Sequence, residues 1–176
     1  MFQMEICKEY IELHEMIREI RVAMLTTMEA NGCLRSLPMS TIQTECDGNI
    51  YFFTNFDSKK VEEIKSHTCV NVSYAEVSTN SYVSISGKAD IIRDKDKMGE
   101  LWKPFLAAWF PKGIDDPDLA LLKVSIDEAE YWDAKESKMV QLWKIAKAAI
   151  KGEKMPYNRP GEHKKIQDNK KDYQGS

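Results

Sequence analysis

The residues best suited to chemistry gather where an apolar stretch ends and a helical pattern begins. Thr54, Ser58, Lys59 and Lys60 fall within seven residues, directly after the apolar residues 50–53. Unpaired backbone N–H groups and the helix dipole favour negative charge at a helix N-terminus. The pattern therefore indicates an anion-binding site. The same residues also suit an ordinary helix start, in which Ser58 is the N-cap and both lysines lie in solvent.

The other polar residues form no familiar catalytic arrangement. The sequence has no G-x-S-x-G motif, no P-loop and no G-x-G-x-x-G motif after a strand. Its four cysteines and three histidines lack metal-ligand spacing, so we expect reduced thiols and no metal. Asp115 and Asp116 either position a loop at a site or cap a helix that starts near Pro117. A bound cofactor could carry the chemistry, with its phosphate in the anion site, but these residues do not name it.

Composition and charge exclude several classes of protein. The 176 residues suit one domain with extensions, and the net charge of -3 gives no support for non-specific nucleic-acid binding. No apolar run approaches the roughly 20 residues of a membrane-spanning helix. The first residues also lack the apolar region of a signal peptide. We therefore expect a cytoplasmic protein that binds neither nucleic acid nor membranes.

Alternating apolar residues predict an antiparallel sheet. Strands are expected at residues 22–28, 33–44, 50–53, 70–76 and 82–92, with last strand segments at 121–125 and 128–132. Residues 29–32 and 46–49 suit tight hairpin turns. Pro38 places its strand at an edge or a bulge, and Gly87 indicates a bulge or bend. These features predict a mainly β fold with flanking helices (α+β), in which the antiparallel sheet curls into a barrel.

Helical periodicity predicts the elements that flank this sheet. Helices are expected at residues 6–21, 58–67, 94–109 and 139–150. Pro104 marks a kink or a restart of the third helix. Trp102 and Trp109, seven residues apart on it, would share a face typical of core or interface packing. We expect one domain over residues 1–150 and a polar, lysine-rich flexible tail over residues 151–176.

Several segments resemble one family. The run FFTNFDSKK resembles the phosphate-binding segment of pyridoxamine 5′-phosphate oxidase-like flavoproteins, which fold as FMN-binding split barrels. The segments LRSLPMS, NVSYAE, YVSISGKAD, AWFPKGIDDPDLALLKV and EAEYWD resemble the general stress protein 26 branch of that family, in the right order. The resemblance covers roughly residues 10 to 150 and implies a homodimer with FMN bound at the subunit interface.

The resemblance also implies which residues bind FMN. They are Arg35, Leu37, Pro38 and Met39 beside the isoalloxazine ring, Phe53 and Thr54 at the end of the next strand, Ser58, Lys59 and Lys60 at the phosphate, and Trp109 with its loop as a wall. Lys60 is favoured over Lys59, because many members of the branch keep only the second cation. Consecutive helix residues also diverge by about 100°, so both lysines need not face one ligand.

The resemblance leaves the reaction open. Its leading implication is an oxidoreductase-like protein in which flavin N5 exchanges a hydride with an unidentified small molecule. The alternative is a non-catalytic protein that stores, senses or buffers FMN. A true pyridoxamine phosphate oxidase is disfavoured, because such enzymes carry an arginine-rich C-terminal segment with a tryptophan. This chain instead has QLWKIAKAAIKG and a lysine-rich tail, with Arg159 as its only late arginine.

Overall fold

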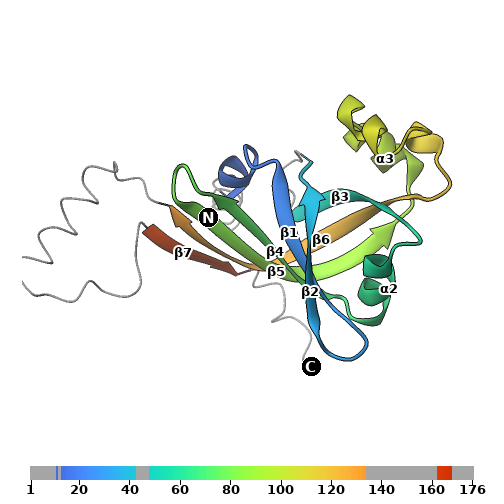
Figure 1. The fold of residues 1–176 in the computed structure, drawn as a ribbon. Coiled ribbons are helices and arrows are strands. Elements are labelled where there is room, and N and C mark those ends of the chain that lie inside the picture. Colours follow the sequence, from blue (N-terminus) through green and yellow to red (C-terminus); the bar gives the residue numbers. More distant parts are fainter. Residues whose placement is uncertain (1–10, 12, 43–47, 134–161, 168–176) are drawn as a thin grey trace, which may run out of the picture.

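One curled sheet dominates the computed structural model, which describes residues 11, 13–42, 48–133 and 162–167. The strand order is β2-β1-β4-β5-β6-β3, and β7 pairs with β6. The strands are β1 (Val22–Met28), β2 (Leu34–Ser40), β3 (Asn49–Asn55), β4 (Cys69–Glu76), β5 (Ser81–Ile92), β6 (Leu119–Asp133) and β7 (Glu162–Gln167). The helices are α2 (Lys59–Ser66) and α3 (Lys95–Leu101), with the 3-10 helices η1 (Pro104–Ala108) and η2 (Gly113–Asp115). All strand pairs are antiparallel and the sheet curls into an open barrel, which confirms the predicted split-barrel fold (Figure 1).

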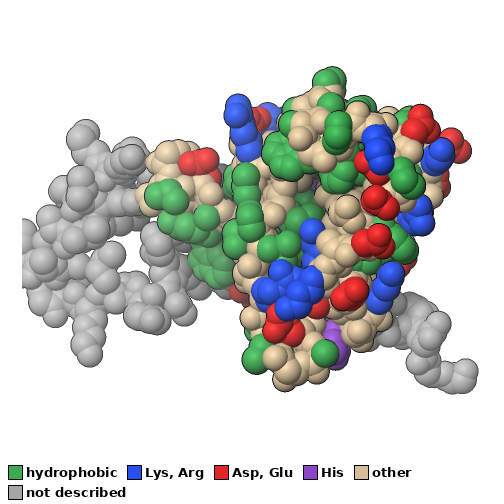
Figure 2. All heavy atoms as spheres, turned by 45° about the vertical axis from the view of Figure 1, so that its right-hand side comes forward, with side chains coloured by type: hydrophobic (Ala, Val, Ile, Leu, Met, Phe, Trp, Pro, Cys, Tyr) green, Lys and Arg blue, Asp and Glu red, His purple; other side chains and the backbone are tan. Residues whose placement is uncertain are grey.

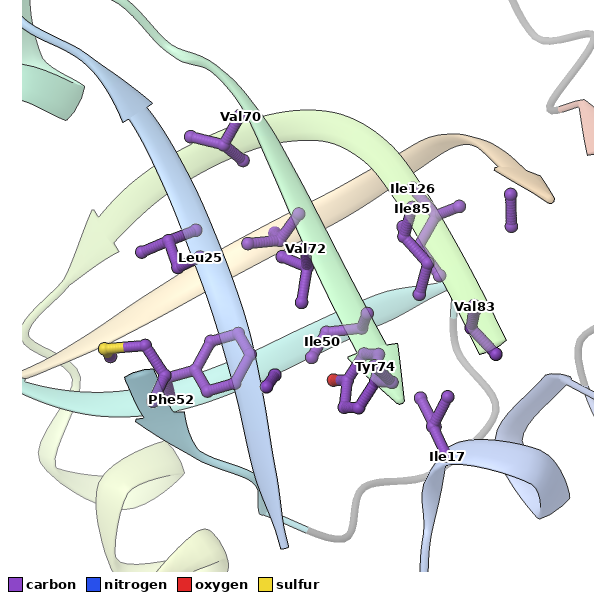
Figure 3. Packing of buried hydrophobic residues seen from close by; sticks show 14 of the residues in the cluster. Ile17, Leu25, Ile50, Phe52, Val70, Val72, Tyr74, Val83, Ile85 and Ile126 are labelled. Atoms are coloured by element: carbon purple, nitrogen blue, oxygen red, sulfur yellow. The ribbon is translucent and has the colours of Figure 1, made fainter. Parts of the chain in front are cut away.

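The inner face of the curled sheet holds the main core. β1 and β4 lie across β3 and β6, and the side chains of Leu25, Phe52, Val72 and Tyr74 pack between them (Figure 3). Side chains alternate between the two faces of a strand, so every second residue of β1 and β4 enters this core. Burial of these apolar side chains is the main contribution to the stability of the barrel.

Strand β3 is buried on both of its faces. Ile50 and Phe52 belong to the main core, whereas Tyr51 and Phe53 join a second cluster with residues of α3 and η1. A strand covered on both sides reads as a continuous apolar run rather than as an alternating one. This position explains why residues 50–53 are all hydrophobic. It also places the polar residues that follow them at the end of β3.

Two special positions in the sheet confirm their predicted roles. Pro38 lies in β2, which is an edge strand, so its missing N–H removes no bond within the sheet. The register between β5 and β6 shifts between Ser86 and Gly87. A Cβ atom at Gly87 would lie 2.2 Å from the main-chain oxygen of Ser125, so only glycine allows this close approach.

The segment expected to be one helix over residues 94–109 is divided in the structure. α3 ends at Leu101, and a separate 3-10 helix, η1, begins at Pro104. Proline disfavours helical geometry in the residue before it and has no N–H to donate, so the chain restarts there. The prediction that Trp102 and Trp109 share a helix face is therefore wrong. Trp102 packs on Phe53, with ring centroids 5.5 Å apart, whereas Trp109 contacts Phe105.

The two strand segments expected at residues 121–125 and 128–132 are one strand, β6. Ser86 pairs with Glu128 and Gly87 pairs with Ile126, so Asp127 is the extra residue of a bulge. The bulge interrupts the apolar pattern without interrupting the strand. Strand β2 is also shorter than predicted, because it ends at Ser40 rather than at residue 44.

The ends of the chain fit the predictions in part. Residues 13–17 are helical, and Leu13, Ile17 and Ile20 are buried as the predicted apolar stripe requires. The expected helix at 139–150 lies outside the described residues. Residues 162–167 differ from the expected flexible tail, because they form β7 along residues 128–133 of β6. β3 covers that side of β6 only over residues 119–125, which leaves main-chain groups there for another strand to pair with. No helix in the described ranges is long and apolar enough to cross a membrane.

Candidate functional site

The predicted anion-binding residues meet where β3 passes into α2. Ser58 occupies the N-cap position of α2, but its side chain makes no capping hydrogen bond. Its Oγ atom instead lies 3.5 Å from Oγ1 of Thr54, which is 2% exposed at the end of β3. The first N–H groups of a helix have no intrahelical acceptor. Two hydroxyls therefore lie beside a helix N-terminus without serving as its cap, an arrangement suited to binding an anion.

The two lysines at this helix start differ in their surroundings. Lys59 is exposed and forms an ion pair with Glu29, and its Nζ atom lies 3.8 Å from a carboxylate oxygen of Glu63. Lys60 is half-buried and makes no ion pair within the described part of the chain. Burial lowers the pKa of Lys60, and the positive charge of Arg35 lowers it further, against a smaller opposing effect of Glu63. An anion beside Lys60 would stabilise its charged form.

A buried carboxylate that the sequence reading missed holds this site together. Glu63 of α2 is 5% exposed and accepts two hydrogen bonds from Arg35, with Nε–Oε1 and Nη2–Oε2 distances of 3.0 and 2.7 Å. Thr27 of β1 donates a third hydrogen bond, of 2.7 Å. The Arg35 hydrogen bond is the main cause that holds the pKa of Glu63 below its usual value. The network ties α2 to the β1–β2 hairpin, where Thr27 pairs with Arg35.

A sequence signal for Glu63 was present but weak. Glu63 follows Lys59 by four residues, the spacing at which helix side chains of opposite charge meet. That spacing describes a surface pair equally well, and Glu62 is its neighbour. Burial of Glu63 depends on the β1–β2 hairpin, whose register with α2 no local pattern reveals.

The residues of β2 are divided between its two faces. Arg35, Leu37 and Met39 point toward the barrel, and Met39 is buried in the main core. Pro38 lies exposed on the opposite face. Because β2 pairs only with β1, its outer edge carries main-chain N–H and C=O groups without ladder partners in the described sheet. Such an edge can form hydrogen bonds with the heteroatoms of a flat ring.

Two of the predicted side-chain contacts are separated from the phosphate residues, one in the second apolar cluster and one in a distant cleft. The Phe53 ring is buried in the second cluster, against Trp102 and Phe110. Trp109 is 63% exposed and lies in a cleft near the other end of β2. Arg35 and Ser40 are five residues apart on β2, a separation of about 16 Å at the usual rise of a strand. The structure therefore brings Arg35, Thr54, Ser58, Lys59 and Lys60 together and places Trp109 apart from them within one chain.

The paired aspartates take part in local loop contacts. Asp115 forms an exposed ion pair of 3.2 Å with Lys95. Asp116 accepts a hydrogen bond from the main-chain N–H of Asp118, and β6 rather than a helix follows at Leu119. Among the described residues, no group of three acidic, histidine or cysteine side chains could hold a metal ion. Figure 2 shows the face with α2 and α3, where acidic and basic side chains are interspersed and hydrophobic ones gather at the top.

The chain is similar in sequence to known proteins. The family model described as pyridoxamine 5′-phosphate oxidase like matches residues 8–156. Protein bli-3 of Neurospora crassa is 27% identical over 158 residues, which cover 84% of this chain and 76% of that protein. General stress protein 26 of Bacillus subtilis is 30% identical over 96 residues, covering 53% of this chain and 68% of that protein.

Solved structures show the same fold. The general stress FMN/FAD binding protein of Xanthomonas citri is similar with a TM-score of 0.61 and 29% identity, covering 72% of this chain and 89% of that one. General stress protein 26 of Bacillus anthracis gives a TM-score of 0.59 with 27% identity, covering 68% of this chain and 92% of that one.

Proposed function

The chain belongs to the pyridoxamine 5′-phosphate oxidase-like family, in its general stress protein 26 branch, and on this premise we propose that it is an FMN-dependent oxidoreductase. The observation that carries the proposal is Lys60, a half-buried cation with a lowered pKa and no ion pair among the described residues. It is the second residue of α2 and follows the N-cap Ser58, whose hydroxyl lies 3.5 Å from that of Thr54. A phosphate group matches these donors in charge and in hydrogen bonding.

The chain's own residues would bind and orient the cofactor. Thr54, Ser58 and Lys60 would hold the phosphate, and the outer edge of β2 from Arg35 to Met39 would bind the isoalloxazine ring. Bound FMN supplies hydride transfer at N5, so the protein need not provide an acid, a base or a nucleophile of its own. The similar Xanthomonas citri protein, described as FMN/FAD binding, supports a flavin as the ligand. A cytoplasmic location stays a prediction.

A flavin titration tests the proposal. We expect FMN to bind the purified chain with quenching of flavin fluorescence. Riboflavin, which has the same ring without the phosphate, should bind at least tenfold more weakly, because it lacks the charge-assisted contacts at Lys60. Equal affinity for FMN and riboflavin would contradict the phosphate site. Failure of both flavins to bind would contradict the proposed function. Anaerobic mixing with NADH or NADPH then tests catalysis, since bleaching of the bound flavin shows electron transfer. A flavin that neither donor reduces favours a storage or sensing protein.

The outer face of the β1–β2 hairpin supports the proposed homodimer. Val22, Met24 and Leu34 are large apolar side chains that are exposed there, and Leu34 is 74% exposed. Pro38 pairs with Met24, so it extends the same apolar surface. An apolar surface of this kind is typical of an interface between subunits. A second copy of this chain is the partner that the family premise suggests.

The oligomeric state of the protein can be measured directly. Light scattering after size exclusion is expected to give twice the 20.3 kDa chain mass. Met24→Glu should shift that mass toward the monomer, because it places a charge in the apolar interface. Glu130→Gln, a change of a charged residue on β6, serves as the control. A wild-type monomer at all concentrations would contradict the dimer.

A further inference from the structure

A cleft of about 800 Å³ lies near the end of β2 that is remote from Arg35. Three segments form it: residues 18–22 before and into β1, residues 40–42 at the end of β2, and η1 with its flanking residues. None of Thr54, Ser58 and Lys60 lines it. The cleft is therefore a separate cavity from the proposed phosphate site in the same chain.

Positive charge with no ion-pair partner in the described part of the chain marks one part of this cleft. Three cations line it, Arg18, Arg21 and Lys103, together with one acid, Glu19. Arg18 forms an ion pair of 3.2 Å with Glu19. Arg21 and Lys103 make no ion pair with any described residue. The paired charges cancel, so the cleft presents two positive charges to a ligand.

Aromatic surface forms another wall. Phe105 and Trp109 lie perpendicular to one another, with ring centroids 6.3 Å apart, and they remain 50% and 63% exposed. Pro104 extends this wall, and the buried residues Ile20 and Ile42 line the cleft as well. Large aromatic side chains that stay exposed beside a cavity suit a flat apolar group.

One residue that lines the cleft has a buried hydroxyl. Oγ1 of Thr41, a lining residue, is buried without a hydrogen-bond partner in the described structure. The hydroxyl of Tyr74, a residue that is 2% exposed, is likewise unpartnered. The two lie close enough for Thr41 to oppose the rise that burial causes in the pKa of Tyr74. Buried polar groups are normally hydrogen-bonded, so an oxygen or water that enters the cleft with a ligand would give Thr41 a partner.

We propose that this cleft binds a small amphipathic anion, with a flat aromatic body against Phe105 and Trp109 and a carboxylate, sulfonate or phosphate at Arg21 and Lys103. The cavity is large enough for a molecule of drug-like size. None of Thr54, Ser58 and Lys60 lines the cleft, so binding of such an anion can be measured separately from binding of the FMN phosphate. Its further role as the molecule that reacts with the flavin rests on the proposed function.

Fluorescence titration of the full chain with 8-anilinonaphthalene-1-sulfonate tests the site. This probe joins a flat aromatic body to a sulfonate, and we expect one bound per chain. The double variant Arg21→Gln/Lys103→Gln should bind it at least tenfold more weakly. N-phenyl-1-naphthylamine, the same body without the sulfonate, should bind both proteins within about twofold, because it makes no charge contact. Lys112→Gln is the matched control, since Lys112 lies just beyond η1 and does not line the cleft.

Parallel FMN titrations separate this proposal from the flavin function. Lys60→Ala should lose FMN affinity and keep the naphthalene sulfonate, whereas the double variant should do the reverse. Equal sulfonate affinity in the double variant and the wild type would overturn the cleft site. Displacement of the sulfonate by FMN would also overturn it, because the cleft would then belong to the flavin site. If FMN fails to bind while the sulfonate still binds, the proposed function is contradicted and the cleft site is not.

Discussion

Lys60→Ala is expected to weaken FMN binding by roughly 10- to 150-fold, which corresponds to about 1.5–3 kcal/mol. The phosphate would lose a charge-assisted hydrogen bond from a half-buried cation that has no ion pair among the described residues. The measurement is an FMN titration by fluorescence quenching at fixed ionic strength. Folding should be unaffected, since removing a partly desolvated charge with no ion pair relieves an unfavourable burial.

Lys59→Ala is the matched comparison for this prediction. Lys59 precedes Lys60 directly and carries the same charge, but it is engaged by Glu29 and Glu63. Its removal should change FMN affinity by no more than about threefold, because an exposed and already paired charge contributes little. Equal losses in the two variants would show that α2 attracts the phosphate through general positive charge rather than through Lys60.

The lowered pKa of Lys60 adds a pH dependence to FMN binding. Phosphate favours the charged lysine, so FMN binding raises the pKa of Lys60. A Lys60 that is neutral beforehand takes up a proton when FMN binds. FMN affinity should therefore fall as the pH rises toward the ordinary lysine pKa of 10.5, beginning below that value. Lys60→Arg should keep its affinity over the same range, because arginine remains charged. A flat profile for the wild type would argue against a phosphate contact at Lys60.

Glu63→Gln is expected to lower the free energy of unfolding by about 2–4 kcal/mol. The substitution keeps the side-chain shape but leaves Arg35 without its bidentate partner and Thr27 with a weaker acceptor. Because Arg35 is one-third exposed, water partly solvates its charge, and this limits the loss of stability to the stated range. Urea unfolding of the flavin-free protein, followed by tryptophan fluorescence, measures it. Glu62→Gln, an exposed neighbour on α2, should change stability by no more than about 0.5 kcal/mol.

The same carboxylate makes stability depend on pH in the acid range. The pKa of Glu63 in the folded protein lies below its ordinary value of 4.5, mainly because of the Arg35 hydrogen bond. The unfolded chain therefore takes up a proton at Glu63 at a higher pH than the folded chain does. The contribution of Glu63 is complete above about pH 5 and is lost as the pH falls through 4.5 toward the lowered folded value. The Glu63→Gln protein should lack this component, and parallel curves for the two proteins would contradict it.

Local sequence patterns determined much of the fold. The turn at Asn31-Gly32 and the strands around it depend on residues only a few positions apart, so propensity and alternation predict them well. Pro38 at an edge and Gly87 at a bulge follow from the chemistry of single residues. The junction of β3 and α2, with Thr54, Ser58 and Lys60 within seven residues, is local in the same sense.

Contacts between distant segments were decided by the tertiary structure alone. Two examples are β7, which pairs on the free side of β6, and Trp109, whose position follows from the restart of the chain at Pro104. Neither a free strand edge nor the direction of a restarted helix is encoded in nearby residues, because both depend on which elements already occupy the surrounding space.

The anion site shows the same division most clearly. The sequence determined that two lysines follow Ser58 at a helix start. The structure decided that they differ, because the β1–β2 hairpin brings Glu29 to Lys59 and Arg35 to Glu63 while Lys60 is left half-buried. Charges on three separate elements set this difference, and their distances exist only once the sheet has closed against α2. The identity of the residues is therefore a property of the sequence, whereas the fold decides which lysine has no ion pair among the described residues.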